Sequence, residues 1–278
     1  MKVEAGAASR PPVPVRVSAK VSGAVRVLFV RDRARPGGKS RLASLYQHEP
    51  MRVLFPDPLD DPMPAAVLIN TAGGLVGGDA ISVRAGVGPL AAARLTTQAA
   101  ERVYRSAGAT TAVDTNLVVA RDAWLEWLPN ETILFDAARL SRRLVITLAA
   151  GARGERFARG LLHDRWEIRR RDRLVWTDAL RLEGDVAATI DHPACFDGAG
   201  AHAIVVCAGP GAAASLPALR AALPDDGPLA ASLVGDIVVM RGLAREPHVL
   251  RAALVHAVAA ARAAFGGWPA RVPPTWTF

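Results

Sequence analysis

Cysteine is nearly absent from this sequence, whose 278 residues contain only Cys195 and Cys207. Two cysteines cannot form the framework of several disulfides that holds small secreted domains together, and their scarcity fits a reducing cytosol. Lysine is also scarce: of the 34 lysines and arginines, only Lys2, Lys20 and Lys39 are lysines. Because such an arginine bias can follow from nucleotide composition, the formal charge of +8 does not by itself indicate a nucleic-acid binder.

Long apolar runs are missing as well. The N-terminal stretch Met1–Lys20 contains prolines and arginines but no apolar signal-peptide segment, so we interpret residues 1–22 as a flexible leader. The longest uncharged run, residues 198–219, is interrupted by two prolines and several glycines, which argues against a spanning helix. We therefore expect a cytoplasmic protein with no membrane partner.

The signatures of common catalytic and phosphate-binding sites are also absent. The sequence contains no Gly-x-Ser-x-Gly, His-Glu-x-x-His or Cys-x-x-Cys. Residues 38–40, Gly-Lys-Ser, resemble the end of a P-loop, but Arg33 stands where the first glycine should be. His192 and Cys195 have a metal-like spacing, yet a structural zinc site needs about four ligands. We expect no catalytic residues and no enzymatic activity.

Short segments that alternate apolar and polar residues are abundant. Residues 81–87, 113–119 and 165–169 show this period of two, which places one set of side chains on each face of a strand. Further predicted strands are Val25–Val30, Arg52–Phe55, Ala92–Thr97, Leu144–Leu148, Leu174–Thr177, Ala203–Val206 and Ile237–Met240. Because the spacing leaves little room for crossover helices, we expect antiparallel strands in one mainly β domain spanning residues 23–278.

Two segments predict helices. Pro217–Leu223 is a short stretch rich in alanine and leucine, and Pro247–Phe265 is a longer segment with helical periodicity that ends before two glycines. Two interpretations of the apolar stripe on the longer helix stay open: it packs on its own sheet, or part of it docks a partner helix. The stripe consists of Leu250, Leu254, Val258 and Phe265.

A glycine-rich run occupies residues 70–79 and reads Asn-Thr-Ala-Gly-Gly-Leu-Val-Gly-Gly-Asp. Paired glycines permit positive φ angles and the close approach of another backbone. The run is therefore either a tight turn capped by Asp79 or a backbone surface shaped for a ligand or partner.

Carboxylates stand among bulky apolar residues between Trp124 and Asp136. Glu126, Glu131 and Asp136 would be costly to bury unless they are paired, hydrogen-bonded or bound to a metal. One interpretation is ion pairing with the many arginines, and the other is a path of oxygen ligands for a divalent cation.

Taken together, these segments resemble the family of urease accessory proteins called UreD or UreH. The resemblance lies in the runs at residues 70–79, 96–106 and 127–136, with further agreement at 38–56 and 164–182, and it covers residues 25–278. The motif positions in this sequence include Gly73, Gly74, Gly77, Gly78, Tyr104, Arg105, Ser106 and Pro129.

The resemblance implies a fold and a function. The fold would be mainly β, with strands wound in a helical, sandwich-like arrangement and a few helices, one near the C-terminus. The protein would be a non-enzymatic scaffold that binds apo-urease and UreF, recruits the GTPase UreG, and receives nickel that UreE supplies. It would assist GTP-dependent nickel insertion, with Ni²⁺ passing transiently through an internal tunnel and no tightly bound cofactor.

The carboxylates within the matching motifs are the candidates to line that nickel path. They are Asp79, Glu101, Glu131 and Asp136. One departure from the family pattern follows Ala152, where about a dozen residues are absent, enough for about one strand and a turn. The loss of a paired strand would expose its neighbours' hydrogen-bonding groups and could open the tunnel wall.

Two alternatives of other classes remain open from the sequence. A basic, β-rich nucleic-acid binder would present aromatic side chains on one exposed face, but aromatic residues make up only 5% of the chain and do not interleave with the arginines. A carboxylate-pair hydrolase would bring two carboxyl groups together in a cleft, about 5–9 Å apart.

Overall fold

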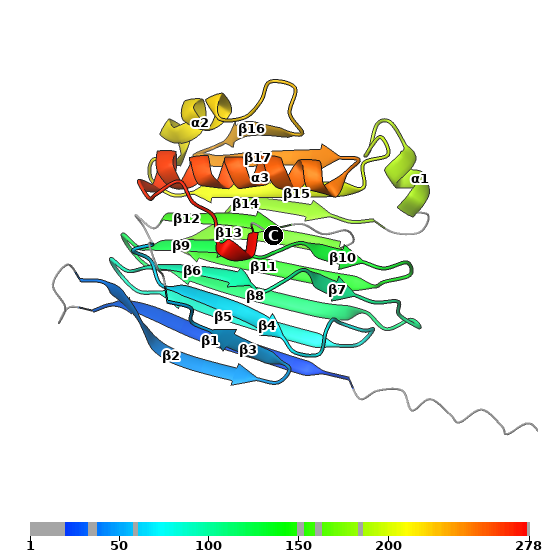
Figure 1. The fold of residues 1–278 in the computed structure, drawn as a ribbon, viewed down its shortest axis with the longest axis horizontal. Coiled ribbons are helices and arrows are strands. Elements are labelled where there is room, and N and C mark those ends of the chain that lie inside the picture. Colours follow the sequence, from blue (N-terminus) through cyan, green and yellow to red (C-terminus); the bar gives the residue numbers. More distant parts are fainter. Residues whose placement is uncertain are drawn as a thin grey trace, which may run out of the picture.

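The computed structural model describes residues 20–32, 38–57, 61–148, 153–158, 163–182 and 186–276, with the backbone alone for 153–158. Strands account for 49% of the chain and helices for 17%, so the fold is mainly β, as predicted. The strands form two large sheets, and helices lie against one of them (Figure 1).

The first sheet, called sheet A here, has seven strands in the order β14-β13-β11-β8-β5-β1-β2. Their bounds are β1 Ser22–Arg31, β2 Ser40–His48, β5 Ala80–Val87, β8 Thr111–Val119, β11 Leu140–Leu148, β13 His163–Arg170 and β14 Arg173–Leu180. The second, sheet B, has eight strands in the order β16-β17-β15-β12-β9-β6-β4-β3. Their bounds are β3 Met51–Leu54, β4 Ala65–Asn70, β6 Ala92–Thr97, β9 Trp124–Leu128, β12 Arg153–Ala158, β15 Ala201–Ala208, β16 Leu229–Val234 and β17 Ile237–Ala244. A small separate pair consists of β7 Glu101–Val103 and β10 Thr132–Leu134.

The chain winds between the two sheets. It passes from β5 in sheet A to β6 in sheet B, returns to β8, and continues through β9, β11 and β12 to β13. As a result β5, β8, β11 and β13 are parallel neighbours in sheet A, and β4, β6, β9 and β12 are parallel neighbours in sheet B. The prediction of antiparallel strands is wrong for these pairs, because a strand of the opposite sheet makes each crossover that was expected to need a helix.

The structure describes three α-helices, and the two longer ones form a third layer on sheet B. Their bounds are α1 Val186–Asp191, α2 Ala212–Ala221 and α3 Pro247–Ala261, followed by a π-helical turn Arg262–Gly266 and a 3₁₀ turn Pro274–Trp276. Helix α3 lies along β15 and β17 (Figure 1). The predicted C-terminal helix is confirmed. The shorter predicted helix begins five residues earlier than expected, at Ala212, so that Pro217 lies inside it.

Two apolar cores hold the layers together. One fills the space between the sheets, and the other lies between sheet B and the helices. All five residues of β9 are buried, since sheet B is covered on both faces. The second core contains the whole apolar stripe of α3, whose four side chains are at most 4% exposed: Leu250, Leu254, Val258 and Phe265.

The burial of this stripe bears on two questions: whether the stripe docks a partner helix, and why the segment is so apolar. The structure favours the interpretation that the stripe packs on its own sheet, because the four side chains offer no surface to a partner helix. The same packing accounts for the apolar character of the segment Pro247–Gly266. By length and composition it could cross a membrane, and it is the one described helix that could.

Two sequence predictions concern segments at the limits of the described chain. The predicted leader, residues 1–22, falls mostly on residues 1–19, which lie outside the described residues, and β1 begins at Ser22. The leader and the single domain from 23 to 278 stay predictions. The expected departure from the family pattern falls on residues 149–152, which lie outside the described residues. The strand that follows, β12, pairs with β9 on one side and β15 on the other.

Candidate functional site

The three motif segments meet at one corner of the molecule, where β7 and β10 lie beside the ends of the main strands (Figure 1). The amide of Leu75 donates to the carbonyl of Arg102 at 2.7 Å, and the amide of Tyr104 donates to the carbonyl of Leu75 at 2.8 Å. The amide of Phe135 then donates to the carbonyl of Val103 at 3.0 Å. Backbone hydrogen bonds therefore join runs that are up to 60 residues apart in the chain.

Glycine is required in this corner because other segments pack directly against it. A Cβ atom on Gly74 would lie 2.5 Å from the ring of Tyr104 and 2.8 Å from the carbonyl of Arg102, and the φ angle of Gly74 is +148°. A Cβ atom on Gly77 would collide with the hydroxyl of Ser106. The glycine run and the second motif therefore pack directly against each other, without room for a side chain at Gly74 or Gly77.

Tyr104 links the second motif to the other two motif segments. Its ring stacks on Phe135 with a centroid distance of 4.9 Å, and its hydroxyl donates to the carbonyl of Gly73 at 3.3 Å. The neighbouring Ser106 hydroxyl donates to the carbonyl of Ala109. The motif residues therefore act chiefly by shaping the loops that surround the cavities described next.

Asp79 is a turn residue in this structure. It is 3% exposed, and its two carboxylate oxygens accept from the backbone amides of Val21 and Val76, both at 2.9 Å. These bonds fasten the glycine run to the start of β1. The geometry favours the interpretation of a capped turn, because a metal ion would compete with two backbone amides for the same oxygens.

Two cavities adjoin at Glu101. An outer pocket of about 300 Å³ lies beside Gly73, Gly74 and residues 97–102, and an inner cavity of about 80 Å³ lies between the sheets. The inner cavity has room for about two or three water molecules. Residues that line both spaces are Met51, Leu68, Thr97 and Glu101.

Glu101 is the one candidate carboxylate among the described residues that lines both cavities. Asn70 donates its side-chain amide to Glu101 at 3.2 Å, and no arginine or lysine of the described chain lies within ion-pair distance. Burial raises the pKa of Glu101 to about 7, and the hydrogen bond from Asn70 only partly offsets that effect. A carboxylate in this state exchanges its proton near neutral pH and presents oxygen ligands suited to a divalent cation.

The inner cavity combines apolar walls with a few polar groups. Arg142, at the end away from the outer pocket, donates to Thr132 at 3.0 Å and forms a bidentate ion pair with Asp164 at 2.6 and 3.0 Å. Because Asp164 balances the charge of Arg142, the guanidinium opposes a cation less than an unpaired one would. The polar residues around the cavity are Thr97, Glu101, Thr115, Asn130, Thr132 and Arg142.

The other two candidates are paired with arginines and line neither the outer pocket nor the inner cavity. Glu131 accepts from Arg251 at 2.5 Å, and Arg251 also donates to Asn130 at 3.2 Å. Asp136 is 92% exposed and pairs with Arg105 at 3.3 Å. For these two carboxylates the structure favours the ion-pair interpretation.

Glu126 belongs to a buried charge network in the layer between sheet B and the helices. It is fully buried and accepts from Arg94 and Arg262, each at 2.6 Å, and from the indole of Trp124 at 3.1 Å. Both arginines also pair with Asp61, at 2.8 and 3.0 Å. Burial opposes ionisation of Asp61, but the two guanidinium charges outweigh it and lower the pKa. The carboxylates that converge here are thus neutralised by arginines, unlike a hydrolase pair.

Sequence reasoning missed several residues of this site. Asn70 and Thr97 each carried one usable signal, because Asn70 is the first residue of the glycine run and Thr97 lies within the second motif. Arg142 and Asp164 carried none, since their pairing arises from the parallel contact of β11 and β13. Among the residues that the structure describes, no group of three or more His, Cys, Asp or Glu side chains could hold a metal ion.

Comparisons with known proteins place the chain in a family. Residues 22–277 match the family described as UreD urease accessory protein. The chain is 39% identical to a urease accessory protein UreD of Magnetococcus marinus, covering 95% of this chain and 97% of the relative. It is 38% identical to a UreD of Rhizobium rhizogenes, covering 86% and 90%, and 40% identical to one of a Methylobacterium species, covering 78% and 84%. The chain belongs to the UreD family of urease accessory proteins.

Proposed function

We propose that this protein is a non-catalytic scaffold of urease maturation that guides nickel from its accessory partners into apo-urease. Family membership supports the role in urease maturation and implies contact with urease and with other accessory proteins. The specific partners would be apo-urease, UreF and, through UreF, the GTPase UreG, with UreE as nickel donor. The setting would be the cytoplasm.

The observation that carries the nickel path is the position of Glu101. Its carboxylate lies where the outer pocket adjoins the inner cavity, and among the described side chains the amide of Asn70 is its one donor. An ion entering from the outer pocket would meet these oxygens first. Single oxygen ligands hold a divalent ion weakly enough to release it, whereas a cluster of cysteines and histidines would trap it.

The test is nickel-dependent activation of apo-urease in a reconstituted system with UreF, UreG and UreE. Glu101→Gln keeps the size of the side chain and removes its charge, and we expect it to lower the rate of activation about tenfold. The matched control is Asp226→Asn, because Asp226 is exposed in the turn after α2, far along the chain from the cavities. We expect this control to activate urease at the wild-type rate.

Variants of the other candidate carboxylates serve as comparisons for Glu101→Gln. Glu131→Gln and Asp136→Asn remove carboxylates that are already paired with arginines, and we expect activation to change by less than about twofold. Co-purification with UreF and apo-urease is measured for every variant, so that loss of the complex is separated from loss of nickel transfer. Full activation by Glu101→Gln within an intact complex would refute the path through Glu101.

A further inference from the structure

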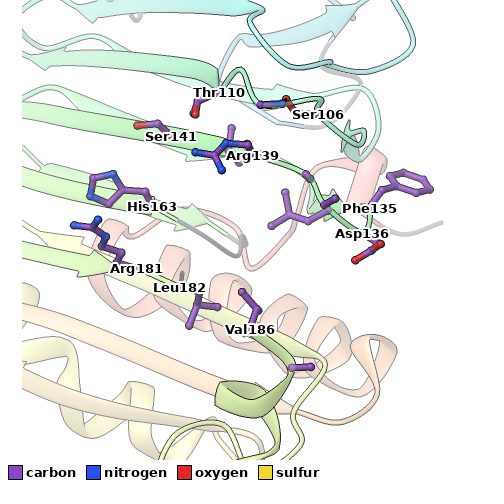
Figure 2. Close-up of a pocket in the computed structure, with 16 residues that line it drawn as sticks. Ser106, Thr110, Phe135, Asp136, Arg139, Ser141, His163, Arg181, Leu182 and Val186 are labelled. Carbon is purple, nitrogen blue, oxygen red and sulfur yellow. The ribbon is translucent and has the colours of Figure 1, made fainter. Parts of the chain in front are cut away.

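A large open cleft lies at the edge of sheet A where β8, β11 and β13 begin and β14 ends (Figure 2). Its volume is about 750 Å³, within the range of small-molecule sites. It shares no lining residue with the outer pocket beside Glu101. The proposed function makes no use of this cleft.

Hydrogen-bond donors from successive strands converge on one side of the cleft. Ser141 and His163 are paired neighbours on β11 and β13, and Arg181 follows the last residue of β14 beside them. Figure 2 shows Arg139 and Ser141 directed to the same side as His163 and Arg181. The parallel pairing of β11 with β13 brings Ser141 beside His163, and the antiparallel pairing of β13 with β14 brings Arg181 to the same edge.

The donors of this cluster are available to a ligand. The side chains of Thr110, Arg139, Ser141 and His163 have no hydrogen-bond or ion-pair partner within the described chain. Arg181 adds its positive charge to this side of the cleft. An arginine can donate two parallel hydrogen bonds to a phosphoryl group, and each neighbouring hydroxyl or imidazole can donate one more.

The charge around the cleft favours an anion. Asp136 is the one carboxylate among the described lining residues, and it is paired with Arg105. Figure 2 shows Asp136 at the opposite end of the cleft from Arg139, His163 and Arg181. A negative group near these three residues would therefore meet no carboxylate from the described lining on its own side.

An apolar wall completes the cleft. Leu182, which follows Arg181, is buried, and Val186, from α1, is half-buried (Figure 2). We propose that this cleft binds an organic phosphate. The phosphoryl group would contact Arg139, Ser141 and His163, and the apolar portion of the ligand would lie against Leu182 and Val186.

Calorimetric titration of the full-length protein tests the proposal with two probes, phenyl phosphate and inorganic phosphate, at fixed pH and ionic strength. We expect saturable binding of phenyl phosphate, and weaker binding of inorganic phosphate because it lacks the apolar portion. The double variant Arg139→Gln, Ser141→Ala removes charge-assisted donors and should weaken both ligands about tenfold or more. Val186→Ser should weaken phenyl phosphate alone.

The control is Arg173→Gln, because Arg173 is exposed at the opposite end of β14 and its loss removes the same charge from the molecule. It should leave both affinities within about twofold of wild type. Three results would overturn the proposal: no saturable binding of either probe, equal weakening by Arg173→Gln, or equal affinity of the two probes for the wild type. Near-ultraviolet circular dichroism of each variant shows whether it remains folded.

Discussion

Two carboxylates of the family motifs have opposite surroundings, although the sequence presents them alike. Asp79 uses both oxygens to accept backbone amides, so its charge is stabilised and its position is fixed. Glu101 accepts from the side-chain amide of Asn70 and lies against cavity walls that are mostly apolar. The difference in partners explains why Asp79 holds a turn and why we propose Glu101, rather than Asp79, as the nickel ligand.

The raised pKa of Glu101 predicts a specific dependence of stability on pH. In the folded protein this carboxyl titrates near 7 rather than at its ordinary 4.5, so the folded state holds the proton over a range in which the unfolded chain has lost it. The contribution of Glu101 to the free energy of unfolding therefore falls as pH rises from about 4.5 to 7 and stays low above that. Glu101→Gln should stabilise the protein by about 2 kcal/mol at pH 8 and much less at pH 5.

Urea unfolding of wild type and Glu101→Gln at both pH values measures this difference, with Asp226→Asn as the control for an exposed carboxylate. An identical pH dependence in the two proteins would show that Glu101 is not held in an unfavourable charged state. The prediction also separates function from folding, because a variant that is more stable at neutral pH cannot lose nickel transfer through unfolding.

At the scale of elements, the buried charge network links parts of the chain that no local pattern connects. Glu126 on β9 binds Arg94 on β6 and Arg262 in the turn after α3. Arg262 also donates to the carbonyls of Pro269 and Arg271, at 2.8 and 2.6 Å. The network thus fastens the end of α3 and the C-terminal segment to the centre of sheet B.

Removing the charge of Glu126 should therefore be severe. Glu126→Gln leaves two buried guanidinium groups with Asp61 as their remaining carboxylate partner, and loss of one member of such a network costs about 3–5 kcal/mol. Asp136→Asn, at the exposed pair with Arg105, should cost less than about 1 kcal/mol. Urea unfolding followed by tryptophan fluorescence compares the two variants, and equal losses would contradict the structural role of the network.

At the scale of the whole molecule, winding between two sheets places strands of very different sequence position side by side. The middle of sheet A is covered by sheet B, and the middle of sheet B is covered on both faces. Strand β2 is different, because it is an edge strand and most of its side chains are exposed. Stability should therefore vary strongly across the fold.

Hydrogen exchange measured by mass spectrometry on the full-length protein checks this expectation. Amides of β6 and β9 in sheet B and of β5 and β8 in sheet A should exchange most slowly, since opening them requires disruption of both layers. Amides of β2 that do not pair with β1 should exchange early. Protection of those β2 amides equal to that of β8 would indicate that another surface covers this edge.

Some strands were predictable from the sequence and others were not, for a physical reason. Strands β5, β8 and β13 of sheet A alternate because one face meets the core and the other carries many polar side chains. Strand β9 shows no alternation, since Trp124 and Glu126 face the helix layer while Leu125 and Trp127 face the other sheet. A pattern with period two cannot appear where both faces are buried.

By itself, the sequence determined the mainly β fold, the C-terminal helix and the family, because alternation, helical periodicity and long ordered motifs are properties of contiguous residues. Only the tertiary structure decided that the neighbouring strands are parallel, that the stripe of α3 is buried, and which candidate carboxylate adjoins a cavity. These outcomes depend on contacts between residues far apart in the chain, such as Glu126 and Arg262, which are 136 positions apart, and no local pattern records them.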